Sequence, residues 1–273
     1  MMNLDINTLY QRYLNGESIC GVLAPELGIS RCVIYKAFKD AGLTIKNNRE
    51  KSLKYSCNEH YFDIIDTQDK AYWLGFISAD GYITSNMKYF GMSLSSKDIE
   101  VLQNLKDDLE ATYPIKHYVV KQGYTVGVEY DRLIISNPTL VNGLYLHGVV
   151  PHKTNILQPP SGLPEELQRH YLRGYFDGDG SVSVSKGKTM SWDILSTFPM
   201  LDYFSEILYS NHIIDRYYPY EKRKPEHQVA RIRFSKHKSL INIFHFMYDD
   251  AYRKLERKYN KFIEYFTEHN IEY

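Results

Sequence analysis

Apolar side chains recur at helical spacing in the first 45 residues and predict three short helices. The predicted helices are INTLYQRYLN, which ends at Gly16, then SICGVLAPELG and SRCVIYKAFKDAG. Ser30 is a candidate N-cap of the third helix, and Gly42 follows its end, where a left-handed residue can close a helix. The recurring apolar positions are Ile19, Val22, Leu23, Leu27, Val33, Ile34, Ala37 and Phe38. This pattern predicts a small all-α domain over residues 1–45.

The second and third helices, joined by a tight turn at residues 28–30, resemble a helix-turn-helix. In that motif the second helix lies in the DNA major groove. Pro25 departs from the pattern because it removes a backbone donor inside the predicted second helix. The alternative is a plain three-helix packing unit whose lysines are only solvated. Residues 46–60, with few apolar side chains and an excess of Lys and Arg, predict a basic linker.

The rest of the chain contains an internal repeat. The segments AYWLGFISADGYI (71–83) and HYLRGYFDGDGSV (170–182) are each apolar for about two turns, carry a central glycine and end in Asp-Gly. Gly75 matches Gly174 and Asp80 matches Asp179, since 174 − 75 and 179 − 80 are both 99. A single Asp-Gly pair is an ordinary turn. Two copies at constant spacing in matching contexts favour a functional role for the two Asp-Gly pairs over ordinary turns.

Alternating and helical patterns after each copy predict the same order of elements, helix-strand-strand-helix-strand-strand-helix. In the first copy the strands flank residues 85–86 and 122–123, and the last helix covers residues 138–147. In the second copy the strands are SVSVS, SWDILST, DRYYPYE and QVARIRFS. We therefore expect an α+β fold of two pseudosymmetric αββαββα halves, residues 61–160 and 161–273, that form a saddle about a pseudo-twofold axis.

The paired motifs predict a metal site between the halves. A glycine within a helix costs about 0.5–1 kcal/mol relative to alanine, so Gly75 and Gly174 suggest close backbone packing of the two motif helices. If the helices pack in parallel, Asp80 and Asp179 converge at one end. Two carboxylates at the unfavourable end of two helix dipoles favour a compensating cation. With water and phosphate oxygens they suit Mg²⁺ and the hydrolysis of phosphodiesters.

Composition narrows the class of protein. The 273 residues are 43% hydrophobic and 24% charged, which excludes a disordered chain, and the 33 Lys and Arg balance the 33 Asp and Glu. Only local charge clusters therefore indicate a polyanionic partner. The three cysteines Cys20, Cys32 and Cys57 form no CxxC pair, which argues against a disulfide framework or a structural zinc site. No apolar run reaches the length of a membrane span, so we expect a cytoplasmic protein without membrane contact.

The segments WLGFISADG and LRGYFDGDG resemble the two signature motifs of LAGLIDADG homing endonucleases in their single-chain form. The resemblance covers about residues 60–267. It implies that the motif helices form the interface, that each half lays a sheet in the DNA major groove, and that Asp80 and Asp179 bind Mg²⁺ at the cleavage site. Ser78 stands where many members have an acid, whereas Asp177 keeps the acid, for which we expect a packing or hydrogen-bonding role.

The resemblance also implies basic residues near the metal. HGVVPHKTNIL (147–157) and LERKYNKF (255–262) are similar to the family segments that carry them, which indicates Lys153 and Lys258 as electrostatic catalysts. The alternative is that both are surface lysines.

Charge clusters support binding to double-stranded DNA. Residues 216–238 hold eight Lys and Arg against two Glu, and alternation places Arg231 and Arg233 on one face of a predicted strand. The candidate DNA-binding residues are Arg31, Lys36, Lys39, Lys116, Lys121, Arg132, Lys222, Arg223, Lys224, Arg231 and Arg233.

We therefore expect a monomeric homing endonuclease that makes a Mg²⁺-dependent staggered double-strand break in a long pseudo-palindromic site. The termini lack splicing residues, which favours a free-standing protein of an intron or mobile gene from a bacterium or phage over an intein. Two alternatives stay open. One is a DNA-binding regulator that has lost cleavage, and the other is an RNA maturase on the same scaffold.

Overall fold

The computed structural model describes residues 5–45, 54–185, 189–222 and 228–273. Most of the predicted linker, residues 46–53, lies outside the described residues. The chain divides into two compact units, Met1–Lys54 and Tyr55–Tyr273, each of which is described by itself.

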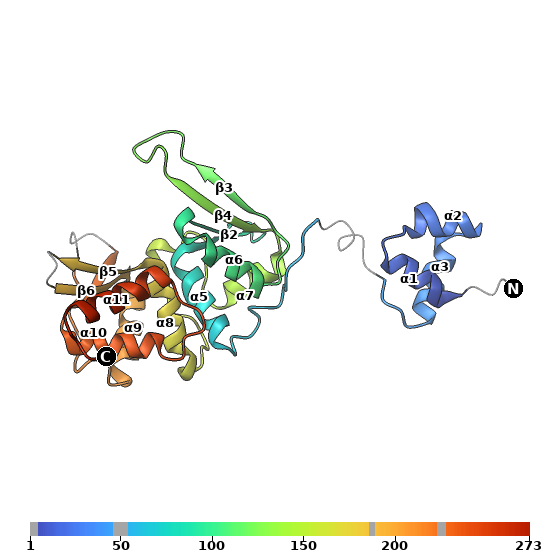
Figure 1. Cartoon of the computed structure of the whole chain (residues 1–273). Helices are drawn as coiled ribbons and strands as arrows, with labels where there is room; N and C mark the ends of the chain where they lie inside the picture. The colour runs from blue at the N-terminus through green and yellow to red at the C-terminus, as the bar shows by residue number, and fades with distance from the viewer. Residues whose placement is uncertain (1–4, 46–53, 186–188, 223–227) are drawn as a thin grey trace. The chain divides into compact units, whose positions relative to one another are not determined.

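The smaller unit contains the three predicted helical segments (Figure 1). They are α1 (Ile6–Leu14), a π-helical turn (Ile19–Leu23) that continues into α2 (Ala24–Leu27), and α3 (Arg31–Asp40). Ser30 caps α3 as predicted, because its hydroxyl accepts a hydrogen bond from the backbone N–H of Cys32 at 3.1 Å. Pro25 falls in the first turn of α2, where its missing N–H removes no bond of a regular α-helix.

A separate core holds this unit together. Its buried members are Leu9, Tyr13, Ile19, Leu23, Ala24, Ile34 and Phe38. Val22 and Val33 share the helical spacing of the core residues, but both side chains are exposed. The three segments are too short to bury every apolar position of their pattern.

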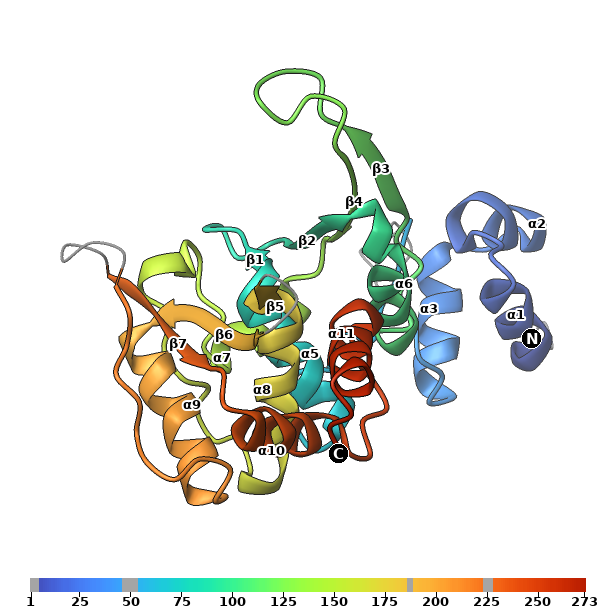
Figure 2. The same cartoon turned by 60° about the vertical axis from the view of Figure 1, so that its left-hand side comes forward.

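The first half of the larger unit has the predicted order αββαββα. Its elements are α5 (Gln68–Asp80), β1 (Gly81–Ile83), β2 (Phe90–Ser95), α6 (Ile99–Asp108), β3 (Ile115–Val119), β4 (Glu129–Ile135) and α7 (Pro138–Leu146). The strands form an antiparallel sheet in the order β1-β2-β4-β3. Helix α6 packs against β2 and β4, and the β3–β4 hairpin projects beyond the sheet (Figures 1 and 2).

The second half repeats this order, except that its described residues form three strands instead of four and that an additional helix follows. Its elements are α8 (Glu165–Asp179), β5 (Gly180–Ser185), β6 (Thr189–Thr197), α9 (Phe198–Ser210), β7 (Val229–Phe234), α10 (His237–Tyr248) and α11 (Glu256–Glu268). The described strands form an antiparallel sheet in the order β5-β6-β7, with α9 against β6 and β7. The last helix, α11, extends the predicted order, and residues 186–188 at the predicted β5–β6 turn lie outside the described residues.

The predicted strand DRYYPYE is wrong over its described residues, which contribute only the isolated bridge Glu221–Arg231. Hydrogen bonds from tyrosine hydroxyls, and not the backbone hydrogen bonds of a sheet, hold this segment in place. Tyr217 donates to Glu206 on α9, and Tyr220 donates to Asp202 on α9 at 2.6 Å. Tyr218 donates to Asp215 within the segment at 3.2 Å. Alternating aromatic residues therefore gave a strand-like pattern to a segment that side-chain hydrogen bonds hold in place.

The two halves meet through α5 and α8, which lie side by side (Figures 1 and 2). A Cβ at Gly75 would lie 2.1 Å from the carbonyl oxygen of Tyr171, and a Cβ at Gly174 would lie 1.9 Å from that of Tyr72. Since 171 − 72 equals 174 − 75, the contacts are reciprocal, as a pseudo-twofold axis requires. The predicted close approach of the helix backbones at the two glycines is confirmed.

Both halves share one continuous core around this helix pair. It includes the two tryptophans, Trp73 on α5 and Trp192 on β6, which are both buried. Among the helices that the structure describes, none has the length and apolar character needed to cross a membrane.

Candidate functional site

The acidic ends of α5 and α8 converge, as predicted. Asp80 and Asp179 are the last residues of the two helices. A Cβ at Gly178, next to Asp179, would lie 3.5 Å from Oδ2 of Asp80. The carboxyl of Asp80 therefore lies against the terminal turn of the opposite helix.

The glycines after the two aspartates end the helices in a way that the sequence did not indicate. Gly81 and Gly180 have φ of −79° and −75°, so neither is a left-handed cap. Space is the constraint instead. A Cβ at Gly81 would lie 2.9 Å from the carbonyl oxygen of Ile77, and one at Gly180 would lie 2.5 Å from that of Phe176. Strands β1 and β5 can thus begin directly after the aspartates that end α5 and α8.

The electrostatics at the helix ends are those of crowded carboxylates. Burial, together with the negative charge of Asp179, raises the pKa of Asp80 to about 6 against the opposing effect of nearby lysines. The pKa of Asp179 is also raised by desolvation, although its side chain is more exposed. The two carboxylates therefore repel one another at a place where positive charge would be stabilising.

The two predicted lysines also reach these helix ends. Nζ of Lys153 donates to the carbonyl oxygen of Ala79 at 2.6 Å, next to Asp80. Lys153 begins a short 3-10 turn, Lys153–Asn155, and is half-buried. It lines a cavity of about 640 Å³ together with Asp80 and the start of β1. Burial lowers the pKa of Lys153, while both aspartates oppose that effect.

Lys258, in the first turn of α11, lies at the end of α8. Its Nζ lies within 2.9 Å of four backbone carbonyl oxygens, those of Phe176, Asp177, Gly178 and Gly180. Burial lowers the pKa of Lys258 to about 8, against the opposing charge of Asp177, Asp80 and Asp179. Both lysines are thus integral to the helix ends, and neither is a simple surface residue.

The residues present fit a hard divalent cation held jointly with a substrate. Among the described residues, no group of three or more His, Cys, Asp or Glu side chains forms a ready-made metal cage. The donors at the site are two carboxylates with mutual repulsion and adjacent backbone carbonyls. Oxygen donors of this kind suit Mg²⁺, which keeps several waters and commonly shares phosphate oxygens with its protein ligands.

Asp177 has the hydrogen-bonding role expected for it. Its carboxylate is buried and accepts hydrogen bonds from Tyr72 and Tyr248 at 3.0 Å and from the N–H of Leu255 at 2.7 Å. Burial raises the pKa of Asp177 to about 6. The contacts join α5, α8, α10 and the segment before Lys258. The sequence identified the acid but not these partners.

Two cavity residues were missed from the sequence. His152 precedes Lys153 and has a left-handed backbone, φ 57°, and its Nε2 lies 3.0 Å from Oγ of Ser85. Both side chains line the cavity that holds Asp80. Positive φ at a residue other than glycine costs free energy and is common at functional sites. The position of His152 beside a predicted catalytic lysine was the signal that could have identified it.

On the first sheet, the face opposite α6 carries basic and aromatic side chains. Arg132 pairs with Lys116 across β4 and β3. The guanidinium of Arg132 lies 5.2 and 5.4 Å from the ring centroids of Tyr118 and Tyr130, and its Nε donates to Ser93 at 2.9 Å. Lys121, also predicted, is exposed beyond the end of β3. These contacts hold the arginine in place on an open sheet face.

On the second sheet, Arg231 and Arg233 share one face of β7, as the alternation predicted. Each has an acidic partner. Arg231 lies 2.9 Å from Glu221, and Arg233 lies 3.7 Å from Asp193 on β6. The charge of this face is therefore lower than the residue count over 216–238 indicated. Lys222 lies over the ring of Phe198 at 4.5 Å, whereas Arg223 and Lys224 lie outside the described residues.

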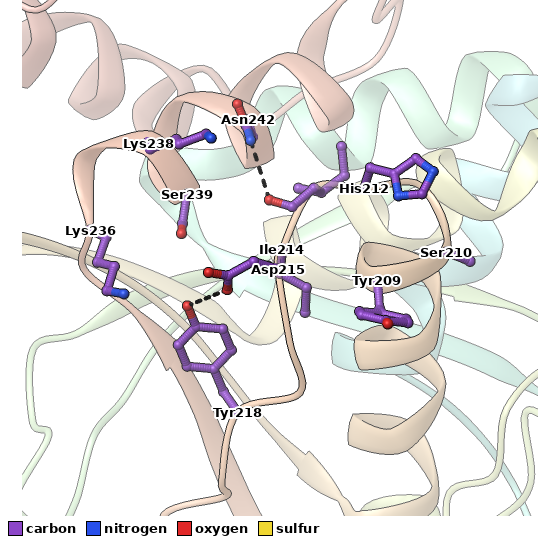
Figure 3. A pocket seen from close by; sticks show the side chains of 11 residues that line it. Tyr209, Ser210, His212, Ile214, Asp215, Tyr218, Lys236, Lys238, Ser239 and Asn242 are labelled. Carbon is purple, nitrogen blue, oxygen red and sulfur yellow. Dashed lines mark hydrogen bonds between the residues drawn. The ribbon is translucent and has the colours of Figure 1, made fainter.

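The remaining candidate DNA-binding residues are in the smaller unit. Arg31, Lys36 and Lys39 are all exposed on α3. In the larger unit, a different cavity of about 470 Å³ lies between the end of α9 and the start of α10 (Figure 3). Lys236, Lys238 and Asp215 line it, but neither motif aspartate does. It is therefore separate from the site at the helix ends.

Comparison with known proteins identifies the part of the chain that carries this site. Residues 67–142 and 166–201 match the family model of the LAGLIDADG-like domain. A stretch of 121 residues is 31% identical to DNA-directed RNA polymerase subunit Rpo1C of Methanocaldococcus jannaschii. That stretch covers 43% of this chain and only 13% of the relative.

Solved structures of similar proteins include a LAGLIDADG homing endonuclease and a LAGLIDADG meganuclease, both with DNA. I-LtrWI bound to target DNA is 14% identical, covering 78% of this chain and 92% of its own, with a TM-score of 0.49. I-CpaMI bound to uncleaved DNA is 13% identical, covering 76% and 94%, with a TM-score of 0.49. Full-length DUF199/WhiA from Thermatoga maritima is 16% identical, covering 78% and 65%, with a TM-score of 0.48. The family match includes both aspartate motifs, and this part of the chain is similar to a LAGLIDADG-like domain.

Proposed function

We propose that the protein is a site-specific DNA endonuclease that cuts both strands of a duplex. The observation that carries the proposal is the convergence of Asp80 and Asp179 at the adjoining ends of α5 and α8, with one lysine at each helix end. Two carboxylates with raised pKa values and nearby ammonium groups form a site suited to phosphate chemistry.

The proposed reaction is hydrolysis of a phosphodiester in each strand. A water oxygen attacks phosphorus, the bond to the 3′ oxygen breaks, and the products are a 5′-phosphate and a 3′-hydroxyl. Asp80 and Asp179 would hold Mg²⁺, which supplies charge neutralisation and a more acidic water when bound. Ammonium groups at the helix ends stabilise the additional negative charge on the phosphate. We expect cuts that are staggered between the strands.

The surfaces of the chain support recognition of a long duplex. The first sheet presents Arg132 and Lys116 on an open face, and the second presents Arg231 and Arg233 beside acidic partners. The two faces differ in charge, which favours a pseudo-palindromic target over a symmetric one. We also propose that residues 1–45 act as a helix-turn-helix, with Arg31, Lys36 and Lys39 toward DNA, and that residues 46–60 link it to the two halves. One chain carries both motifs, so a monomer has both acids.

The test is selection of cleaved sites from a randomised duplex library with Mg²⁺, followed by sequencing of the ends. Asp80→Asn and Asp179→Asn should each abolish double-strand cleavage and leave DNA affinity within a few-fold. Asp107→Asn, an exposed acid on α6, is the matched control and should cut normally. Normal cutting by Asp179→Asn would refute the assignment of the site. Specific binding without Mg²⁺-dependent nicking would favour a regulator, and splicing rescued by the Asp80→Asn/Asp179→Asn double variant would favour an RNA maturase.

A further inference from the structure

A buried carboxylate in the first sheet lacks a full set of hydrogen-bond partners. Asp131, on β4, is only 2% exposed and shares a face of the sheet with the core residues Leu133 and Ile135. Its Oδ2 has no hydrogen-bond partner among the residues that the structure describes. A buried charge without partners is costly, so this carboxylate calls for a bound cation or water.

The other oxygen of Asp131 lies beside a histidine. His117 is opposite Asp131 across β3 and β4, and its Nδ1 is 3.2 Å from Oδ1 of Asp131 and 3.4 Å from Oγ of Ser96. An unprotonated Nδ1 can accept from Ser96 but has nothing to donate to Asp131, and a protonated Nδ1 has one N–H for both oxygens. Hydrogen bonds alone therefore leave these three polar side chains poorly satisfied.

The spacing of the three atoms suits a metal ion. Zn²⁺ binds imidazole nitrogen at about 2.0–2.1 Å and carboxylate oxygen at about 2.0–2.2 Å, so tetrahedral ligands lie roughly 3.3 Å from one another. The distances of 3.2 and 3.4 Å around Nδ1 of His117 match that separation. The side chain of His117 is 52% exposed, so water can reach the remaining coordination positions.

A second histidine–aspartate pair in the chain has a different character. Nδ1 of His245, on α10, lies 3.0 and 3.1 Å from the two carboxylate oxygens of Asp249. The side chain of Asp249 is 55% exposed, whereas that of Asp131 is 3% exposed. Water can therefore satisfy the carboxylate of Asp249, and this pair is a matched control for the buried one.

We propose that Ser96, His117 and Asp131 form a transition-metal site, with Zn²⁺ as the ion whose ligand preferences fit best. Nδ1 of His117 and a carboxylate oxygen of Asp131 bind the ion, and Oγ of Ser96 and water complete its coordination. The metal neutralises the buried charge and joins the 3-10 turn Ser96–Asp98 to the β3–β4 hairpin. The imidazole ligand separates this site from the one proposed for Mg²⁺, which prefers oxygen donors. The inference does not depend on the nuclease function.

Titration of the full chain with Zn²⁺ in excess Mg²⁺ tests the site. A Cys20→Ser/Cys32→Ser background removes the two exposed thiols as competing ligands. Isothermal titration calorimetry should detect Zn²⁺ binding that His117→Ala and Asp131→Asn each weaken by about tenfold or more, whereas His245→Ala should leave it unchanged. Binding that survives His117→Ala, or that His245→Ala weakens equally, overturns the proposal.

Thermal unfolding gives a readout that is independent of the calorimetry. At about a hundredfold excess over its Kd, Zn²⁺ should raise the melting temperature of the larger unit by roughly 5–10 °C. The rise should be absent in His117→Ala, whose replaced side chain is half exposed, so that folding is retained. A rise of the same size in His117→Ala overturns the proposal.

The histidine ring nitrogens report the ligand atom directly. In long-range ¹H–¹⁵N correlation spectra of the full chain with ¹⁵N-labelled histidine, Zn²⁺ should shift the Nδ1 resonance of His117 and leave that of His245 in place. Mg²⁺ at the same concentration should shift neither. An unchanged His117 resonance overturns the site, and a bound water then remains as the partner of Asp131.

Discussion

The close backbone packing of α5 and α8 can be tested directly with the variant Gly174→Ala. The added methyl carbon would lie 1.9 Å from the carbonyl oxygen of Tyr72 and 2.8 Å from its carbonyl carbon. Both are backbone atoms of α5, so no side chain can rotate to make room. The two helices must move apart, and the ends that carry Asp80 and Asp179 must move with them.

The magnitude follows from two opposing effects. Alanine favours the helix over glycine by about 1 kcal/mol. Overpacking by a methyl group costs roughly 1–3 kcal/mol, and a clash with main-chain atoms belongs at or above the top of that range. We expect a net loss of about 2–3 kcal/mol in the free energy of unfolding, and a fall of roughly 5–10 °C in the melting temperature of a unit of this size.

Tryptophan fluorescence during urea unfolding is a suitable assay, because both tryptophans, Trp73 and Trp192, are buried in the larger unit. Gly143→Ala is the graded control. A Cβ there would meet the nearest atom, the carbonyl carbon of Phe62, at 3.2 Å, which a small shift relieves. An unfolding midpoint for Gly174→Ala equal to that of the unaltered protein would refute the close packing of α5 and α8.

Three further predictions concern charge. Asp177→Asn should flatten the pH dependence of stability. Because burial raises the pKa of Asp177 to about 6, the folded state binds the proton of this carboxyl more tightly than the unfolded state does. The carboxyl therefore adds about 1 kcal/mol to the free energy of unfolding as pH falls from 7 to 5, which the difference between the unfolding curves of the two proteins measures. Arg253→Ala should lower the free energy of unfolding by about 2–3 kcal/mol, measured by fluorescence, because it leaves Asp108, which Arg253 contacts at 2.6 Å, without its ionic partner. Arg257→Ala should lower it by under 1 kcal/mol because the pair of Arg257 with Asp98 is more exposed, and equal losses for the two variants would contradict this difference. Arg132→Ala should weaken duplex binding and reduce the slope of log affinity against log salt by about 1, measured by titration at several salt concentrations. Arg233→Ala should have a smaller effect because its guanidinium lies near Asp193. An unchanged slope for Arg132→Ala would show that Arg132 does not contact the DNA.

The sequence alone determined the repeat and most of the elements. Local patterns are sufficient for this, because apolar periodicity reports which side of an element is buried. The 99-residue spacing and the central glycines also predicted the close packing of the two motif helices at Gly75 and Gly174, since a costly glycine in both copies requires a common reason. The strand prediction for DRYYPYE failed because tyrosines can fill a strand face or donate hydrogen bonds at a surface, and the pattern is the same in both cases.

Only the tertiary structure decided how the predicted residues are used. Lys153 and Lys258 are equivalent as sequence motifs, yet one lines a cavity and the other holds the end of α8. Arg231 and Arg233 gain acidic partners from other segments, which a local charge count cannot reveal. Hydrogen bonds and ion pairs depend on atoms brought together by packing from distant parts of the chain. The residues at the two helix ends could therefore be predicted from the sequence, whereas the partners that each of them contacts required the fold.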